Sequence, residues 1–195
     1  MAAFADLIDL QTAVVELVKD ASIVDVFPRL VQLAEVNFNQ RLRCFDQITN
    51  VTVTISSGLA TLPSNFIEMI GLYNASGYEY VQQPLQSVKL STATHFYAIA
   101  GTSLVTKIAD GDLSADYYAQ VPTLTTSNTT SNWLLAKYPG IYLYGVGVEA
   151  AKYLQKANVA VALAQVLEME FTAAEGCDTR SRYSRARVRV AGVTP

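Results

Sequence analysis

The stretch YLYGVGVEAA, residues 142–151, decides between two possible folds. Gly145, Gly147 and Ala150 spell G-x-G-x-x-A, the fingerprint whose glycines let a backbone approach a dinucleotide pyrophosphate. That fold needs several parallel strands after its fingerprint. Here only about fifty residues follow, and they hold two helical patterns and an arginine-rich end. Glu168, near the offset of a ribose-binding acid, lies inside a helical pattern. The glycines are therefore predicted to allow helices to approach closely, and no cofactor is expected.

Helical periodicity continues on the C-terminal side of this stretch. Residues 140–156 are predicted to form one helix and residues 158–175 the next. Asn158 is a suitable N-cap for the second of these helices. Gly176 is the residue type that usually follows a helix end in the left-handed conformation.

Two more helices are predicted at the N-terminus, over residues 4–19 and 25–43. Asp25 is expected to cap the second helix, with Pro28 in its first turn, where a missing N–H costs little. Apolar residues at helical spacing predict its buried stripe, and polar residues are expected to lie away from it. The apolar set is Phe27, Leu30, Val31, Ala34, Phe38 and Leu42, and the polar set is Arg29, Gln32, Glu35 and Arg43.

The segment between these helices has a different pattern. Residues 48–121 contain short β-prone runs, with glycine-containing turns expected near Gly58, Gly101 and Gly111. A polar Ser/Thr/Asn linker, residues 122–132, follows. The expected fold class is α+β: a bundle of N- and C-terminal helices with an inserted small antiparallel sheet. Residues 1–177 are predicted to form the body, and residues 178–195 an extended C-terminal arm.

The composition favours a protein that is covered by partners. Only 16% of the 195 residues are charged, against about 25% in a typical domain, and the mean hydropathy is +0.22. A monomer of this size needs more polar surface, so part of the exterior is expected to face copies of the chain or other proteins.

Sorting signals and structural cysteines are not expected. The N-terminus carries Asp6 and Asp9 where a secretory signal would be basic, and no apolar run is long enough to span a membrane. Cys44 and Cys177 are expected to be reduced thiols, because nothing around them has metal-site or secretory spacing.

Two groups of residues could form an enzymatic or a metal-binding site. His95 is the single histidine, and no nucleophile motif accompanies it, so ordinary hydrogen bonding is favoured over catalysis. The DGDLSAD segment, Asp110 to Asp116, imitates half of a calcium loop, but Ala115 and Val121 replace the required glycine and glutamate. A turn rich in Asp and Gly explains the same letters. No catalytic, cofactor or metal residue is therefore predicted.

Charge is concentrated at the C-terminus. Residues 178–195 carry five arginines and one aspartate, a net charge of +4, which leaves −7 on residues 1–177. The arginines recur at spacing two, so in an extended strand they would project to one side. A solvated tail, an arm that docks on an acidic surface and an arm that adds a strand to a neighbour's sheet all remain open; nucleic acid is a weaker candidate. The predicted docking residues are Arg180, Arg182, Tyr183, Arg185, Arg187 and Arg189.

Aromatic residues gather in the C-terminal half. Tyrosine and tryptophan are favoured at protein interfaces, although they also occur in cores. The low charge content favours an interface between subunits. Its predicted residues are Trp133, Tyr138, Tyr142 and Tyr144.

The order of these segments resembles the head-to-tail connector, or adaptor, proteins of tailed bacteriophages. FPRLVQLAEVNFNQRLRC, residues 27–44, is similar to the family's early helix, and LATLPSNFIEMIGLY, residues 59–73, to its strand–turn–strand pattern. The closest stretch runs from paired tyrosines through Asn-Trp-Leu-Leu to a tyrosine-rich helix, residues 113–154. The arginine-rich end completes a resemblance that covers the chain from about residue 24 onward.

The resemblance implies a non-enzymatic virion protein at the head–tail junction, assembled in the host cytoplasm. Its expected partners are the portal protein, other copies of itself in a ring of twelve, and a tail or nozzle protein, with genomic DNA passing through the channel. The C-terminal arm is expected to grip the portal. Another ring-forming tail-completion protein is the first alternative, and a small hydrolase that uses His95 is the second.

Overall fold

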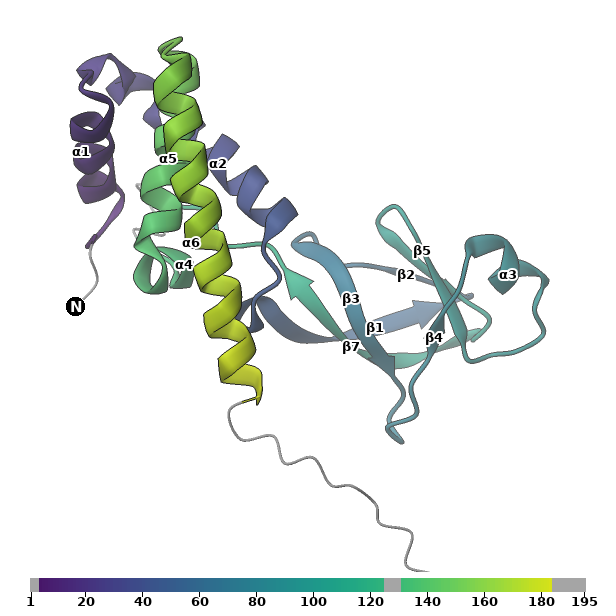
Figure 1. Cartoon of the computed structure of the whole chain (residues 1–195). Coiled ribbons are helices and arrows are strands. Elements are labelled where there is room, and N and C mark those ends of the chain that lie inside the picture. The colour runs from purple at the N-terminus through teal and green to yellow at the C-terminus, as the bar shows by residue number, and fades with distance from the viewer. Residues whose placement is uncertain (1–3, 125–130, 184–195) are drawn as a thin grey trace, which may run out of the picture. The chain divides into compact units, whose positions relative to one another are not determined.

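The computed structural model describes residues 4–124 and 131–183 (Figure 1). The chain divides into two compact units. A helical unit is built from the residues before 47 and after 120, and a β unit from residues 47–120. The predicted α+β class, with a sheet inserted between helices, is confirmed.

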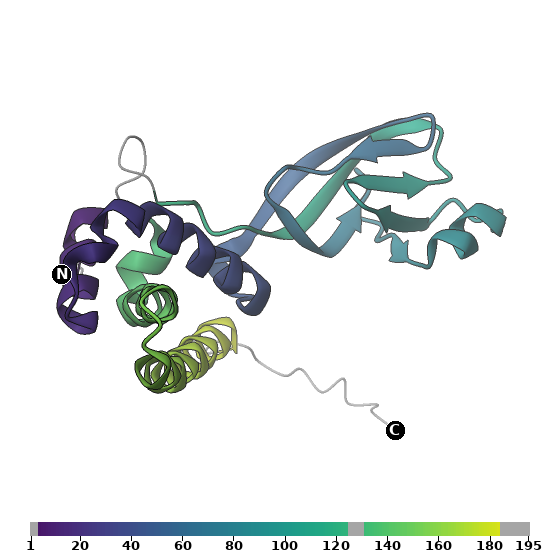
Figure 2. The same ribbon diagram turned by 90° about the horizontal axis from the view of Figure 1, so that it is seen from above.

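The helical unit is organised around α5, Pro139–Tyr153. The helices α1, α2, α4 and α6 all contact it, and Figure 2 shows α5 between α2 and α6. Eight of its fifteen residues are buried, so α5 is the central element of this unit. The remaining helices are α1 Leu7–Val18, the 3₁₀ turn η1 Ala21–Val26, α2 Phe27–Arg41, α4 Trp133–Lys137 and α6 Ala157–Tyr183.

The two glycines of the opening stretch lie where neighbouring helices come closest to α5. A Cβ atom on Gly145 would overlap the ring of Phe38 on α2. A Cβ atom on Gly147 would lie 3.0 Å from Leu17 Cδ2 on α1 and 3.3 Å from Leu163 Cδ1 on α6. The prediction that these glycines allow close helix packing is confirmed.

Aromatic contacts extend the core of the helical unit from this point. The Phe38 ring meets Tyr142 edge-on, with 5.2 Å between ring centroids, and Phe171 of α6 at 6.1 Å. The apolar stripe predicted on α2 is confirmed, since all six of its residues are buried.

The β unit, all of whose residues are described, holds one seven-stranded sheet in the order β3-β7-β1-β2-β6-β5-β4. Strands β1 and β7 pair antiparallel over nine residues, from Ile48↔Tyr118 to Ser56↔Asp110. Only the β4–β5 pair is parallel. The elements are β1 Ile48–Ser56, β2 Leu59–Thr61, β3 Phe66–Tyr73, β4 Val81–Gln82, α3 Leu85–Leu90, β5 Phe96–Ala100, β6 Ser103–Thr106 and β7 Asp110–Ala119.

The turn glycines of this sheet were predicted in part. Gly58 and Gly101 adopt positive φ angles, 80° and 62°, in the β1–β2 and β5–β6 turns. Gly111 has a φ of 147°, but it lies inside β7, where it pairs with Ile55. The turn expected at Gly111 is therefore wrong.

Several predicted helix boundaries are also wrong. Helix α1 spans Leu7–Val18 where residues 4–19 are predicted, α2 ends at Arg41 and not at residue 43, and α5 ends at Tyr153 and not at residue 156. Helix α6 begins at Ala157, one residue before Asn158, and it passes through Gly176 to Tyr183. Asp25 lies in η1, and α2 begins after Val26 without a side-chain cap. The residue types at Asp25, Asn158 and Gly176 are typical of helix caps and helix ends, and this is why boundaries are predicted there. A glycine inside a helix costs only about 1 kcal/mol of stability, so a long helix such as α6 can continue through Gly176.

Candidate functional site

Helix α6 has two faces of different character. One face packs on α5 through buried residues that include Leu163, Phe171 and Ala174. The opposite face is exposed, yet it is apolar or neutral over more than three turns; Val161 and Met169 are 60% and 69% exposed. We call this face the α6 stripe and define it as Val161, Gln165, Met169, Thr172 and Ala173.

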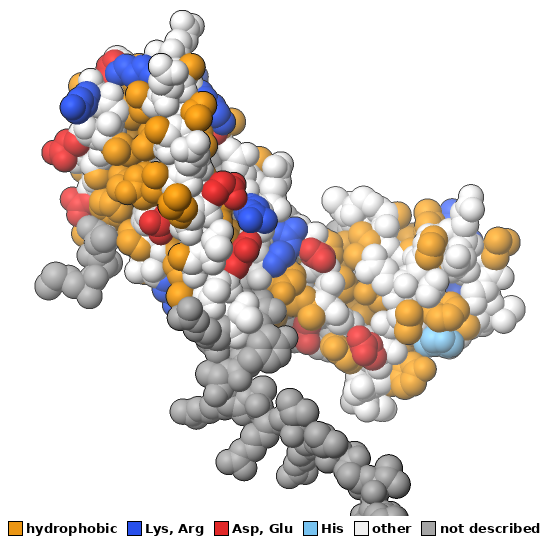
Figure 3. Space-filling model, in the orientation of Figure 1, with side chains coloured by type: hydrophobic (Ala, Val, Ile, Leu, Met, Phe, Trp, Pro, Cys, Tyr) orange, Lys and Arg blue, Asp and Glu red, His pale blue; other side chains and the backbone are white. Residues whose placement is uncertain are grey.

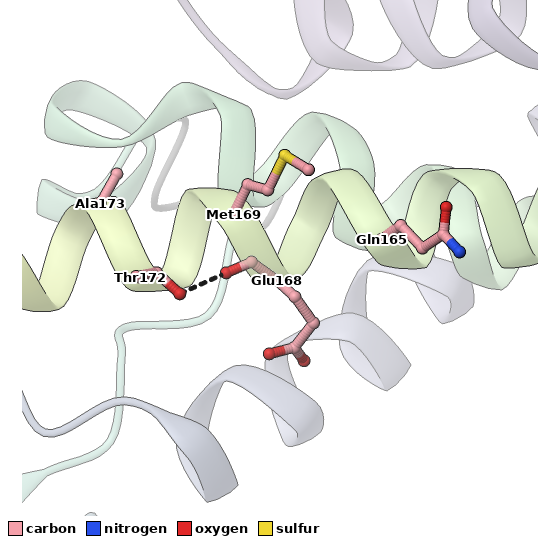
Figure 4. A pocket seen from close by; sticks show the side chains of 5 residues that line it. All are labelled: Gln165, Glu168, Met169, Thr172 and Ala173. Carbon is pink, nitrogen blue, oxygen red and sulfur yellow. Dashed lines mark hydrogen bonds between the residues drawn. The ribbon is translucent and has the colours of Figure 1, made fainter.

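The α6 stripe contains no charged residue. Glu168 lies at its edge, where its carboxylate is 3.7 Å from Arg41 of α2. Of the described residues, Gln165, Glu168, Met169, Thr172 and Ala173 line a surface pocket of about 690 Å³, and Figure 4 shows these five side chains on α6. The Thr172 hydroxyl donates to the Glu168 carbonyl within the helix at 2.9 Å, so the stripe presents few polar groups of its own.

A second exposed apolar face lies on α2. Leu33 and Val36 are 53% and 54% exposed, and they point away from the buried residues that face α5. Arg29 and Gln40 continue the same row at helical spacing. We call Arg29, Leu33, Val36 and Gln40 the α2 stripe. Figure 3 shows hydrophobic side chains gathered on the visible face of the helical unit, with Lys, Arg, Asp and Glu side chains around them.

A buried polar network fixes α2 to the chain that returns from the β unit. The Glu35 carboxylate accepts hydrogen bonds from the Leu124 amide at 2.8 Å and from the Tyr142 hydroxyl at 3.0 Å. Asn132 donates to the same hydroxyl at 2.7 Å, and Asn39 accepts from the Val121 amide at 2.8 Å. These bonds position α2, and with it the α2 stripe, on α5.

Burial changes the acid–base properties of this network. Glu35 is 3% exposed, and loss of solvent raises the pKa of its carboxyl, although the hydrogen bonds from Leu124, Tyr142 and Thr123 act in the opposite direction. Burial and the nearby Glu35 also raise the pKa of Tyr142. The expectation that Glu35 lies away from the buried face of α2 is wrong, because the polar network satisfies it inside the core.

The predicted subunit-interface residues do not form one surface. Tyr142 is fully buried within its own helical unit, so a second copy cannot cover it, and its placement at an interface is wrong. Trp133, Tyr138 and Tyr144 are half-buried and keep part of their surface exposed. Their role in an interface remains a prediction.

The predicted docking arm begins as helix. Arg180, Arg182 and Tyr183 belong to the last turns of α6. The expectation that the arm is extended from residue 178 onward is therefore wrong for residues 178–183. Arg185, Arg187 and Arg189 lie outside the described residues, and their docking role is untested.

His95 and the aspartates of the DGDLSAD segment are engaged in ring packing and in cross-strand hydrogen bonds. The half-buried His95 ring packs against Phe96 at 4.2 Å and Tyr78 at 6.4 Å between centroids. Asp112 and Asp116 accept hydrogen bonds from Thr54 and Asn50 across the β1–β7 pair. Within residues 4–124 and 131–183, no three His, Cys, Asp or Glu side chains are grouped to hold a metal ion.

The two cysteines are thiols and form no disulfide with each other; Cys44 is buried and Cys177 is exposed. None of the helices in the described segments has the length and apolar character needed to cross a membrane.

The comparisons with known proteins identify the family. No curated protein matches the chain. The family described as SU10 adaptor protein matches residues 5–191, nearly the whole chain, and the match includes both units and the N-terminal helix that the motif resemblance did not cover. This agrees with the resemblance seen in the order of the sequence motifs. The chain therefore belongs to the SU10 adaptor protein family, whose members are structural adaptor proteins of bacteriophage virions.

Proposed function

We propose that this protein joins the phage portal to the tail as a ring-shaped adaptor and carries out no catalysis. The observation that carries this proposal is the family match over residues 5–191. The uncharged, exposed α6 stripe supports the self-association, because interfaces lose charged residues at their centre while isolated surfaces keep them.

In this proposal, residues 178–195 attach the adaptor to the portal protein. Their five arginines give this segment a net charge of +4, against −7 on residues 1–177, and arginine suits bidentate recognition of carboxylates. The segment after Tyr183 has twelve residues, which reach at most about 40 Å when extended. An arm of that length can contact a neighbouring protein while the helical unit stays in its own ring.

The remaining partners follow from this position. Twelve copies form the ring, a tail or nozzle protein binds its free side, and genomic DNA passes through the channel at the head–tail junction. Net charge of −7 on residues 1–177 repels phosphate, so DNA slides through such a ring without being retained. Strong retention of DNA by the assembled ring would contradict this part of the proposal.

The experiment that tests the proposal is portal binding by arm variants. Arg185, Arg187 and Arg189 are replaced together by Gln in one variant and by Lys in another. We expect the Gln variant to lose portal binding in a pull-down and the Lys variant to keep part of it, because lysine retains charge but not the bidentate geometry. Equal binding by wild type and the Gln variant would exclude these three arginines from docking.

The main alternative is a ring-forming tail-completion protein of the same virion. Such a protein binds tail components and shows no affinity for the portal. The same pull-down with purified tail proteins separates the two functions, since the adaptor proposal requires binding to the portal.

A further inference from the structure

Two exposed apolar stripes lie on different sides of the same helical unit. Helices α2 and α6 both pack on α5 through their buried residues (Figure 2), and each stripe consists of residues on the exposed side of its helix. One copy of the chain therefore cannot bring its own stripes together. Two different faces that complement each other produce head-to-tail association, which closes into a ring when the rotation between subunits allows it.

The two stripes match in length. The α2 stripe runs from Arg29 to Gln40 and spans about 17 Å at 1.5 Å per residue. The α6 stripe runs from Val161 to Ala173 and spans about 18 Å between its first and last residues. Each stripe can therefore cover the other along nearly its whole length.

They also match in chemistry. Leu33 and Val36 offer branched apolar side chains, and Met169 offers a flexible one that adapts to its neighbours. The α2 stripe carries one charge, the exposed Arg29, and the α6 stripe is bordered by Glu168, whose exposed carboxylate lies 3.7 Å from Arg41 of the same copy. Opposite charges at the edges of two apolar rows favour their pairing.

We propose that the α6 stripe of one copy packs on the α2 stripe of the next copy and that this contact is the lateral interface of the ring. The inference rests on the proposed function, because it names the partner surface for the self-association proposed there. A single helix pair buries less than the roughly 800 Å² per partner of a stable interface. The contact is therefore weak between two copies and becomes stable when the ring closes.

The test blocks each stripe separately with exposed glutamates. The first variant combines Gln165→Glu and Met169→Glu, and the second combines Leu33→Glu and Val36→Glu. All four side chains are exposed, so both variants are expected to fold like wild type, which circular dichroism checks. The control is Gln86→Glu, an added charge on the exposed surface of α3 in the β unit.

Sedimentation of the full-length proteins at high concentration gives the result. We expect wild type and the control to associate as the concentration rises. The dissociation constant of each blocked variant should be at least about 30-fold higher, which corresponds to the loss of about 2 kcal/mol from an apolar residue at the centre of the interface. A one-to-one mixture of the two variants forms a heterodimer and nothing larger, because one intact α6 stripe meets one intact α2 stripe.

Other outcomes overturn the pairing. If the second variant, with its α2 stripe blocked, forms dimers by itself, two α6 stripes bind each other. If the first variant, with its α6 stripe blocked, forms dimers by itself, two α2 stripes bind each other. A wild type that stays monomeric at every concentration shows that the stripes do not join two copies. Portal binding remains measurable in that case, so failure of this pairing is distinct from failure of the adaptor function.

Loss of portal binding by the first variant, with no change in sedimentation, would assign the α6 stripe to the portal and overturn the pairing.

Discussion

The hydroxyl of Tyr142 donates a 3.0 Å hydrogen bond to the Glu35 carboxylate and thereby joins α5 to α2 across 107 residues of sequence. Both side chains are excluded from solvent, with Glu35 3% exposed and Tyr142 fully buried. The carboxylate also holds the Leu124 amide, so one acidic group fixes α2, α5 and the chain that follows β7. Removal of this group is expected to affect the whole helical unit.

The first prediction concerns the acceptor at position 35. Glu35→Ala leaves the Leu124 N–H and the Tyr142 O–H buried without their acceptor, at a cost of roughly 1–3 kcal/mol for each group. Glu35→Gln keeps an acceptor oxygen and is expected to lose much less. Urea denaturation of both variants measures the free energy of unfolding. An equal decrease of this free energy in the two variants would show that Glu35 does not stabilise the protein through these hydrogen bonds.

The second prediction is the pH dependence of the same site. Burial raises the pKa of Glu35 above its ordinary value of 4.5, so the folded state holds the proton more tightly than the unfolded state. Its contribution to the free energy of unfolding is therefore largest below pH 4.5 and falls as the pH rises through the raised pKa. The difference in stability between wild type and Glu35→Gln, measured from pH 4 to pH 8, should shift in favour of the Gln variant. A difference that does not change with pH would contradict the raised pKa.

The third prediction compares the two glycines of α5. Gly145→Ala places a methyl group into the ring of Phe38, whereas Gly147→Ala meets only the movable ends of Leu17 and Leu163. Because both changes gain the same helix propensity, Gly145→Ala should be less stable than Gly147→Ala by about 1–3 kcal/mol. Thermal unfolding of the pair tests this, and the opposite order would show that α2 and α5 are not packed through Gly145.

The fourth prediction concerns the β unit. Its first and last strands pair at Ile48↔Tyr118, which brings the two ends of the insertion to within about 5.5 Å of each other. A chain in which a short Gly/Ser link replaces residues 48–119 should keep the helical unit folded. Cooperative loss of helical circular dichroism on heating checks this, and an aggregated or non-cooperative product would show that the helical unit depends on the sheet.

The fifth prediction separates the adaptor from the small hydrolase. His95 packs against Phe96 and Tyr78, and Asp112 and Asp116 are bonded across the sheet to Thr54 and Asn50, as expected for structural residues. Replacement of His95 by Gln, and of each aspartate by Asn, should leave the yield of infectious virions unchanged. A loss of assembly with a folded protein would reopen the enzymatic interpretation.

The sequence predicted the features that arise from regular patterns. The apolar spacing from Phe27 to Leu42 identified the buried side of α2, and the position of Gly145 late in the chain identified a packing glycine. The β insertion was predicted from alternation and turn glycines, although the parallel β4–β5 pair was not.

Features that depend on distant partners were not predictable in the same way. Glu35 looked like a surface residue, because its acceptor role requires Leu124 and Tyr142, about ninety and one hundred residues away. Gly176 looked like a helix end, yet α6 continues for another seven residues. The α6 stripe could have been found from sequence, since Val161, Gln165, Met169 and Ala173 repeat every four residues in a helix that needs only one face for its core.

Electron microscopy of the purified full-length protein mixed with the purified portal of its phage tests the central claim most directly. The proposed function predicts rings of this protein stacked on one side of the portal, absent from a parallel sample of the chain truncated after Tyr183. Portal particles that look the same with and without the full-length protein would contradict the adaptor function itself.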